Sequence, residues 1–140
     1  MGLDIYFFDG KREKVGYFRK VNFLLTYFDV DIDEDTEDVE ISREQLATFV
    51  KDLEDELNNR VKPHTLAELE QGLVGHDYSF SEDIVEPVNP RLRCTYVFFG
   101  GSTEYGYWYW NDMVKVYYWA KETLETFDFD NSKLIMWPWW

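Results

Sequence analysis

The chain has few of the residues on which metal-based or nucleophilic chemistry usually depends. Among its 140 residues there are one cysteine, Cys94, and two histidines, His64 and His76. A single cysteine cannot form a disulfide within the chain, and these three residues do not have the spacing of a zinc site. A Cys/His nucleophile pair is an open alternative, but a buried structural cysteine is the more ordinary interpretation. We therefore expect no metal, no cofactor and no catalytic residue.

Long hydrophobic runs and an excess of positive charge are also lacking. No apolar stretch approaches the ~20 residues that cross a bilayer, and the first residues do not have the pattern of a signal peptide. The chain has 28 Asp and Glu against 14 Lys and Arg, which gives a formal net charge of −14. This balance disfavours direct binding to nucleic acid or to anionic lipid, because both partners are recognised through cations. We expect a cytoplasmic protein that binds neither nucleic acid nor membrane.

Aromatic residues, by contrast, are abundant. They make up 19% of the chain, and hydrophobic residues together make up 45%. Such a composition argues against disorder, and the length suits a single domain over residues 1–140. A chain of this size buries about 70% of its unfolded surface and needs no disulfide or metal for stability.

Residue patterns predict an α+β fold. Aromatic and β-branched runs predict strands at 3–8, 39–41, 93–99 and 133–137. Helical spacing of apolar residues predicts three main helices at 15–28, 43–59 and 108–127, with a short helix near 65–71. We expect a small, mostly antiparallel sheet covered by these helices, with the first and last strands paired antiparallel. Pro138 is expected to end the last strand.

The helix predicted at 43–59 has the strongest local signals. Ser42 and Gln45 match a capping box, in which each residue satisfies a backbone amide of the other. Apolar residues at helical spacing form its predicted inner face: Leu46, Phe49, Val50, Leu53 and Leu57. Four charged residues are expected on its outer face: Lys51, Asp52, Asp55 and Glu56.

Two connections stand out from the predicted elements. Residues 29–38 contain seven acidic residues in ten, which is typical of a solvated loop. Calcium binding is disfavoured because neither possible frame has the glycine that an EF-hand loop requires. Residues 72–92 have no clear periodicity and predict a long irregular connection, of a kind that is often functional or mobile.

The stretch FFGGSTEYGYWYWN, from Phe98 to Asn111, combines glycines with a dense run of aromatic rings. A phosphate-binding loop is excluded, because Tyr107 and Trp108 follow Gly106 where Lys and Ser or Thr are needed. The rings either cover a small core or present a binding surface, since Tyr and Trp combine an apolar body with a polar tip. Both interpretations are open at this point.

Three segments together resemble a known group of proteins. MGLDIYFF, VGYFRKVNFLLTYF and VFFGGSTEYGYWYWNDM are similar to motifs of small, uncharacterised bacteriophage and prophage proteins. The likeness covers most of the chain outside about residues 60–92, and it departs at Gly106 and Tyr107, where members usually have Asp and Glu. The resemblance implies a phage or mobile-element context and supplies no mechanism.

Polar residues in the shared motifs suggest a site. We expect Arg19 and Glu104 to form a charge-assisted bond between the first helix and the 101–105 bend. The predicted binding residues are Arg19, Asn22, Glu104, Tyr105, Trp108 and Trp110. The alternative is a purely structural polar clamp that holds the bend.

The sequence leaves three functions in order of preference. The first is a non-enzymatic phage accessory protein that binds a host or phage macromolecule, with the aromatic strip as its surface. The second is an acidic DNA mimic that inhibits a nucleic-acid enzyme, which requires residues 29–38 and 51–56 to form one band of carboxylates. The third is a small-molecule binder or small enzyme that uses the Arg/Asn/Glu/aromatic pocket.

Overall fold

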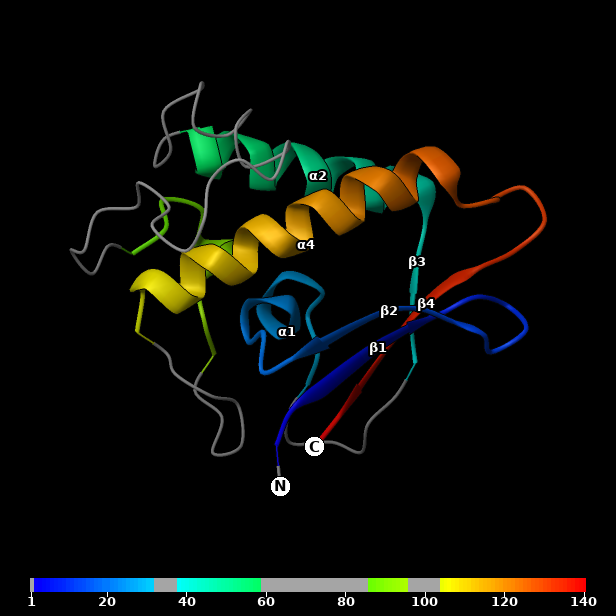
Figure 1. The fold of residues 1–140 in the computed structure, drawn as a ribbon, viewed down its shortest axis with the longest axis horizontal. Helices are drawn as coiled ribbons and strands as arrows, with labels where there is room; N and C mark the ends of the chain where they lie inside the picture. Colours follow the sequence, from blue (N-terminus) through cyan, green and yellow to red (C-terminus); the bar gives the residue numbers. More distant parts are fainter. Residues whose placement is uncertain (1, 32–37, 59–85, 96–103) are drawn as a thin grey trace.

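The structure, a computed structural model, describes residues 2–31, 38–58, 86–95 and 104–140. It has the α+β architecture expected: an antiparallel sheet of four strands with helices packed on one of its faces (Figure 1). Along the chain the elements are β1 (Asp4–Phe8), β2 (Lys14–Arg19), α1 (Phe23–Tyr27), β3 (Val39–Ile41), α2 (Arg43–Asn58), a 3-10 turn η1 (Pro90–Leu92), α4 (Tyr107–Thr126) and β4 (Leu134–Trp139).

The sheet confirms the expected pairing of the first and last strands. Its order is β2-β1-β4-β3, and every neighbouring pair is antiparallel. Asp4 lies opposite Trp139 in β4 on one side and opposite Arg19 in β2 on the other. This register brings the two ends of the chain close together at one end of the sheet (Figure 1).

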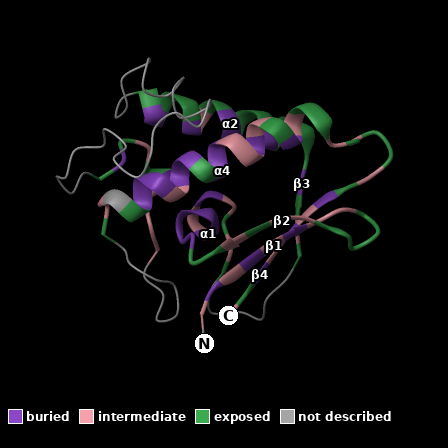
Figure 2. Ribbon diagram, in the orientation of Figure 1, coloured by how far each residue is buried: buried purple, intermediate pink, exposed green. Residues whose placement is uncertain are grey.

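Side chains alternate along the strands between a buried and a more open face. Ile5 and Phe7 of β1, and Leu134 and Met136 of β4, are buried beneath the helices. Figure 2 shows the matching buried positions on α1 and along α2 and α4. Complete burial of an aliphatic or aromatic side chain of this kind contributes about 1.5–3 kcal/mol, so this layer supplies most of the driving force for folding.

Helix α2 confirms its predicted cap and inner face. The Gln45 amide donates to Ser42 Oγ at 3.1 Å, and the Ser42 amide donates to Gln45 Oε1 at 2.9 Å. All five residues of the predicted apolar stripe are buried. The expectation for Glu56 was wrong, because its side chain is only 3% exposed and Oε1 accepts from the Asn89 amide at 2.8 Å. Glu56 adjoins Leu57 and lies beneath the segment that leads into η1, which one helix pattern alone does not reveal.

The helix predicted at 15–28 was also wrong over most of its length. Residues Lys14–Arg19 form β2, and α1 is limited to Phe23–Tyr27. The backbone amides and carbonyls of this segment find partners in β1, with which it forms a hairpin. The turn of this hairpin begins at Asp9 and Gly10. The helical spacing of Phe18 with Val21 and Leu25 came from joining two elements, because Phe18 is on the strand and Leu25 is on the helix.

The remaining predictions were partly confirmed. The helix expected at 108–127 is α4, whereas residues 93–95 of the strand expected at 93–99 are not in the sheet. Its place as a fourth strand is taken by β2. Pro138 lies within β4 and does not end it. At this residue β4 pairs with β1, because β3 pairs with β4 only as far as Met136. The missing proline amide therefore removes no hydrogen bond to β3.

Several predicted segments fall outside the described residues. These are the helix near 65–71, residues 32–37 of the acidic loop, residues 72–85 of the long connection and residues 96–99 of the expected strand. Of the acidic loop, Asp38 forms an ion pair with Arg12 of the β1–β2 hairpin. The C-terminal end of the long connection contains η1. Asn89 caps this turn, and its Oδ1 accepts from the Arg91 amide at 3.0 Å.

Helix α4 contacts the edge strand β2 through Trp119. The indole Nε1 donates to the Val15 carbonyl at 2.9 Å, and the ring packs against Phe7 with 4.2 Å between ring centroids. This close approach depends on Gly16, because a Cβ there would lie 2.6 Å from Trp119 Nε1. The glycine is therefore required by packing, since its backbone is an ordinary extended strand.

We predict that Gly16→Ala lowers the free energy of unfolding by about 1–3 kcal/mol, the usual cost of overpacking a filled core. Urea denaturation followed by tryptophan fluorescence measures this change. Gly106→Ser is the matched control, because among the described residues no atom beyond the immediate chain neighbours lies within 4 Å of a Cβ at this helix N-cap, and serine suits an N-cap. Equal destabilisation by both substitutions, or none by Gly16→Ala, contradicts the packing role.

Candidate functional site

Three of the six predicted binding residues meet at one cavity. It has a volume of about 280 Å³ and lies where the turn before α1 faces the start of α4. The predicted residues Asn22, Glu104 and Trp108 line it. The other described residues that line it are Lys20, Val21, Phe23, Cys94, Tyr109 and Asp112.

Asn22 connects the two sides of this cavity. Its side chain is buried, and Oδ1 accepts from the Thr95 amide at 2.7 Å. A buried amide group of this kind requires partners, and this bond fastens the start of α1 to the segment after η1. The structural-clamp interpretation expected the 101–105 bend to be the group held, whereas this bond is made to Thr95.

Tyr105 and Trp110 support the cavity from behind and do not line it. The Tyr105 hydroxyl accepts from the Cys94 amide at 3.1 Å, and Trp110 Nε1 donates to the Tyr105 carbonyl at 3.1 Å. Tyr109 adds a hydrogen bond from its hydroxyl to the Leu92 carbonyl. Trp110 and Tyr109 are buried in the core, whereas Trp108 is 71% exposed. Of the described side chains of the aromatic run, Trp108 is thus the most exposed, and its two neighbours towards the C-terminus fill the core.

Arg19 lies elsewhere, because its segment is a strand. The alternation of β2 sends Phe18 towards Phe7 and Trp119 and sends Arg19 to the other face, opposite Asp4. Lys20, which follows it in a left-handed conformation with φ of 60°, lines the cavity in its place. Among the ion pairs of the described residues there is none between Arg19 and Glu104.

Burial changes the protonation of two groups at the cavity. Desolvation raises the pKa of the Cys94 thiol to about 12, so the thiol is protonated at neutral pH and is a poor nucleophile. Desolvation also raises the pKa of Asp112, against a smaller lowering by Lys115. The Asp112 carboxylate therefore lies in a setting that favours its neutral form or a nearby cation.

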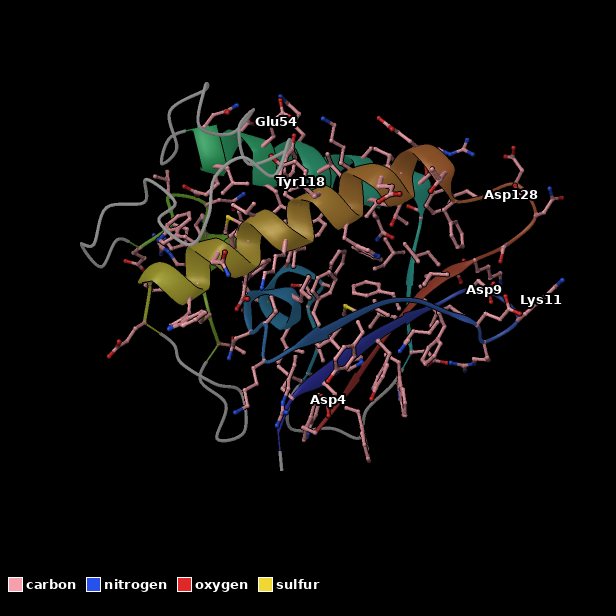
Figure 3. All side chains as sticks on the ribbon, viewed as in Figure 1. Asp4, Asp9, Lys11, Glu54, Tyr118 and Asp128 are labelled. Carbon is pink, nitrogen blue, oxygen red and sulfur yellow. The ribbon has the colours of Figure 1, made fainter. Side chains whose placement is uncertain are left out.

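A second candidate surface lies on the face of the sheet opposite the described helices. Five rings from three adjacent strands form it, and we call it the aromatic face: Tyr6, Phe8, Tyr17, Trp137 and Trp139. None of the described helices covers this side of the sheet, as Figures 1 and 3 show. Tyr17 is 42% exposed and Trp139 is 51% exposed.

The rings of the aromatic face touch one another across the strands. Tyr6 is 5.0 Å from Tyr17, 5.8 Å from Phe8 and 5.8 Å from Trp137, measured between ring centroids. Trp137 and Trp139 stack at 6.0 Å with 12° between their planes. Sequence analysis did not predict this surface, although the aromatic residues of β1 and β4 on this face alternate visibly with the buried ones in the sequence. Naming it needed the strand order and register, which bring separate short runs together.

Positive charge gathers around the aromatic face. Lys14 lies 5.8 Å from the Tyr17 ring and Arg12 lies 5.9 Å from the Phe8 ring. Residues 1–20 contain five Lys and Arg against three Asp and Glu, whereas the rest of the chain has nine against 25. The Tyr17 hydroxyl donates to the Asp4 carboxylate, which raises the tyrosine pKa. The face is thus apolar, with Arg12 and Lys14 near its rings and the Asp4 carboxylate bonded to Tyr17, on a chain that is acidic overall.

The described residues lack two further kinds of feature. No helix among them combines the length and the apolar character that crossing a membrane requires. They also contain no group of three or more His, Cys, Asp and Glu residues placed to hold a metal ion. His64 and His76 lie outside the residues that the structure describes.

We predict that Asp112→Asn raises the melting temperature at pH 7. Because the folded-state pKa of Asp112 is raised, its ionisation opposes folding above that pKa, and the penalty disappears as pH falls through it. The gain over the wild type should therefore shrink between pH 7 and about pH 4. Circular dichroism melts across this range measure it.

Asp128→Asn is the control, and it should lower the melting temperature at pH 7 where Asp112→Asn raises it. A hydrogen bond from Asn131 lowers the pKa of Asp128, so its ionisation favours folding above the unfolded-state pKa and this stabilisation is lost as pH falls. Loss of melting temperature in Asp112→Asn at pH 7 would contradict the effect of desolvation on Asp112.

Comparisons of the chain with protein-family models, with curated proteins and with solved structures gave no match. The similarity to bacteriophage and prophage proteins therefore stays a prediction from the motifs.

Proposed function

We propose that this chain is a non-enzymatic binding protein that holds a partner protein on its aromatic face. The observation that carries the proposal is the set of five rings in mutual contact on a sheet face that no described helix covers. Two of these rings, Tyr17 and Trp139, are exposed and the other three are half-buried, and a contiguous apolar surface that reaches solvent commonly marks an interaction site. Trp and Tyr are also the residues most enriched at the energetic centres of protein interfaces.

Charge favours a protein over a nucleic acid as the partner. The basic residues around the face are few, and Arg12 is already paired with Asp38. A nucleic acid is a polyanion and would be repelled by a chain of net charge −14. A partner protein with only a small acidic rim would be repelled less. Lys14 and Arg19 would face such a rim. We infer that the partner presents an apolar patch flanked by Asp or Glu.

A phage context would make this partner a host or phage protein, in line with the motifs described above. The DNA-mimic alternative has less support, because acidic side chains of α2 are engaged within the protein. Asp52 accepts from the Tyr27 hydroxyl at 2.7 Å, Glu54 accepts from the Tyr117 hydroxyl at 3.0 Å, and Glu56 is buried. Along 51–56, Glu56 is thus buried and Asp52 is half-buried, whereas Glu54 and Asp55 are exposed, so the carboxylates available to mimic DNA are fewer than the alternative assumed.

The experiment compares three forms of the chain as immobilised bait for protein from a bacterial host. Tyr17→Thr combined with Trp139→Thr removes the two most exposed rings of the aromatic face and keeps strand-forming residues. Trp108→Thr is the matched control, since it removes an exposed tryptophan from a different surface. A partner retained by the wild type is then purified, and its binding to each form is measured by calorimetry.

We expect the double variant to weaken binding at least about 100-fold, as loss of central aromatic residues does at interfaces, while Trp108→Thr binds as the wild type does. Hydrogen exchange of the complex should show protection of β1 and β4. Equal binding by the double variant overturns the proposal. So does retention of single-stranded nucleic acid through the aromatic face, or self-association that the double variant abolishes, because each identifies another occupant.

A further inference from the structure

The sheet has an edge strand directly beside the aromatic face. β2 is outermost in the order β2-β1-β4-β3, so only one of its two sides pairs with another described strand. Two of its residues, Tyr17 and Arg19, are exposed. An edge of this kind can accept a strand from another protein, because the outward backbone groups of the edge strand are free to pair.

The register of the β1–β2 hairpin shows which backbone groups point outward. The Lys20 amide donates to the Leu3 carbonyl at 2.7 Å, and hydrogen-bonded and non-hydrogen-bonded pairs alternate along an antiparallel ladder. Counting back from Lys20, Phe18 is again in a hydrogen-bonded pair, whereas Tyr17 and Arg19 are not. The amides and carbonyls of Tyr17 and Arg19 therefore point away from β1, and none of them has a hydrogen-bond partner among the described residues.

Trp119 limits this edge at its other end. The indole Nε1 donates to the Val15 carbonyl at 2.9 Å, so the outward carbonyl that precedes Tyr17 is already occupied. The register of the hairpin also shifts at Val15, and such an irregularity interrupts regular pairing. The open part of the edge is thus the segment from Tyr17 to Arg19, which presents the amides and carbonyls of these two residues.

The charges of β2 favour an acidic strand at this edge. Lys14 and Arg19 lie at the two ends of β2 and Lys20 follows it, and β2 itself contains no carboxylate. Two carboxylates lie beside it, Asp4 opposite Arg19 and Glu13 before Lys14. A second copy of β2 would bring the same cations to the edge, and like charges on neighbouring strands are destabilising. These charges favour a foreign acidic strand over self-pairing.

We propose that an extended acidic segment of the partner protein pairs with β2 and bonds to the backbone of Tyr17 and Arg19. This inference rests on the function proposed above, because it describes how the same partner continues from the aromatic face onto the sheet edge. Side chains of the added strand alternate between its faces. Acidic residues on one face lie near Lys14 and Arg19, and apolar residues on the other lie beside Phe18, which is half-buried against Trp119.

Three capped heptapeptides test this edge on the whole chain. The first alternates glutamate with valine, and the second alternates lysine with valine. The third is the glutamate peptide with its central amides N-methylated, so that it keeps its charge and cannot donate hydrogen bonds. Nuclear magnetic resonance spectra of the isotope-labelled chain report the chemical shift and the hydrogen exchange of each backbone amide.

We expect the glutamate peptide to shift the amide signals of Tyr17 and Arg19. At ten times its Kd it should also slow their hydrogen exchange about tenfold, in proportion to the bound fraction. The Phe18 amide between them is the internal control, because it is already bonded to β1 and should change little. The lysine peptide and the N-methylated peptide should leave all three amides unchanged.

Variants isolate the outward amide and the charge. Tyr17→Pro and Tyr17→Thr both remove the ring, but only proline removes the amide N–H, and at an outward position it takes no bond from the sheet. Tyr17→Pro should bind the glutamate peptide about 2- to 10-fold more weakly than Tyr17→Thr, the usual effect of one hydrogen bond. Arg19→Gln should weaken binding several-fold at low salt. Lys51→Gln is its matched control, because Lys51 is an exposed cation on α2.

Unchanged Tyr17 and Arg19 amides with the glutamate peptide at up to about 5 mM, far weaker than micromolar recognition, overturn the inference. So does equal affinity for the N-methylated peptide, or equal binding by Tyr17→Pro and Tyr17→Thr. Should Tyr17→Pro fail to fold, the hydrogen exchange of the wild-type chain decides alone.

The edge and the aromatic face can fail separately when the purified partner replaces the peptide. A partner that is lost from the Tyr17→Thr, Trp139→Thr variant but leaves the wild-type Tyr17 and Arg19 amides in fast exchange overturns the edge and supports the aromatic face. A partner that protects both amides and binds this double variant as tightly as the wild type overturns the aromatic face and supports the edge.

Discussion

The antiparallel pairing of β1 with both β2 and β4 is the constraint on which the structure depends. β1 is an inner strand, so its residues decide what lies on each side of the sheet. Ile5 and Phe7 point to the helices, and Tyr6 and Phe8 point away. Because side chains alternate along a strand, packing one set against the helices leaves the other set, which is half-buried, on the opposite face. The aromatic face is therefore a direct consequence of building the core.

This pairing also joins the first and last strands of the described fold, which are more than 100 residues apart in sequence. Closing so long a loop costs conformational entropy, which rises only slowly with loop length. The cost is offset by burial of Leu134 and Met136 beneath the helices and by ring contacts on the opposite face. Trp119 then fixes α4 over the hairpin through its contact with Val15 and Gly16.

The start of α4 shows how few side chains are needed to shape a cavity. Trp110 holds the Tyr105 carbonyl, Tyr105 holds the Cys94 amide, and Asn22 holds the Thr95 amide. These bonds connect three separate parts of the chain and leave Trp108 exposed beside the cavity. Arg19 lies on β2 opposite Asp4, on the same side of the sheet as the aromatic face, whereas the next residue, Lys20, lines the cavity. The two candidate surfaces therefore separate at these two residues.

Sequence by itself determined the α+β class, the extent of α2 with its Ser42–Gln45 cap, the long helix after Gly106, and the pairing of the first and last strands. The first three features rest on composition, on capping within three residues or on local periodicity, all of which can be seen in a single segment, whereas the strand pairing was inferred from the order of the predicted elements. It also identified Asn22, Glu104 and Trp108 as residues of one region, and the structure places all three around the same cavity.

Only the tertiary structure decided that residues 14–19 pair as a strand, that Glu56 is buried and that five rings form one surface. Each of these results depends on contacts between distant segments: β2 with β1, Glu56 with Asn89, and Tyr6 with Trp137. A periodic pattern within one segment cannot show which neighbour will cover it. Burial and hydrogen-bond partners belong to pairs of segments, and those pairs exist only once the chain has folded.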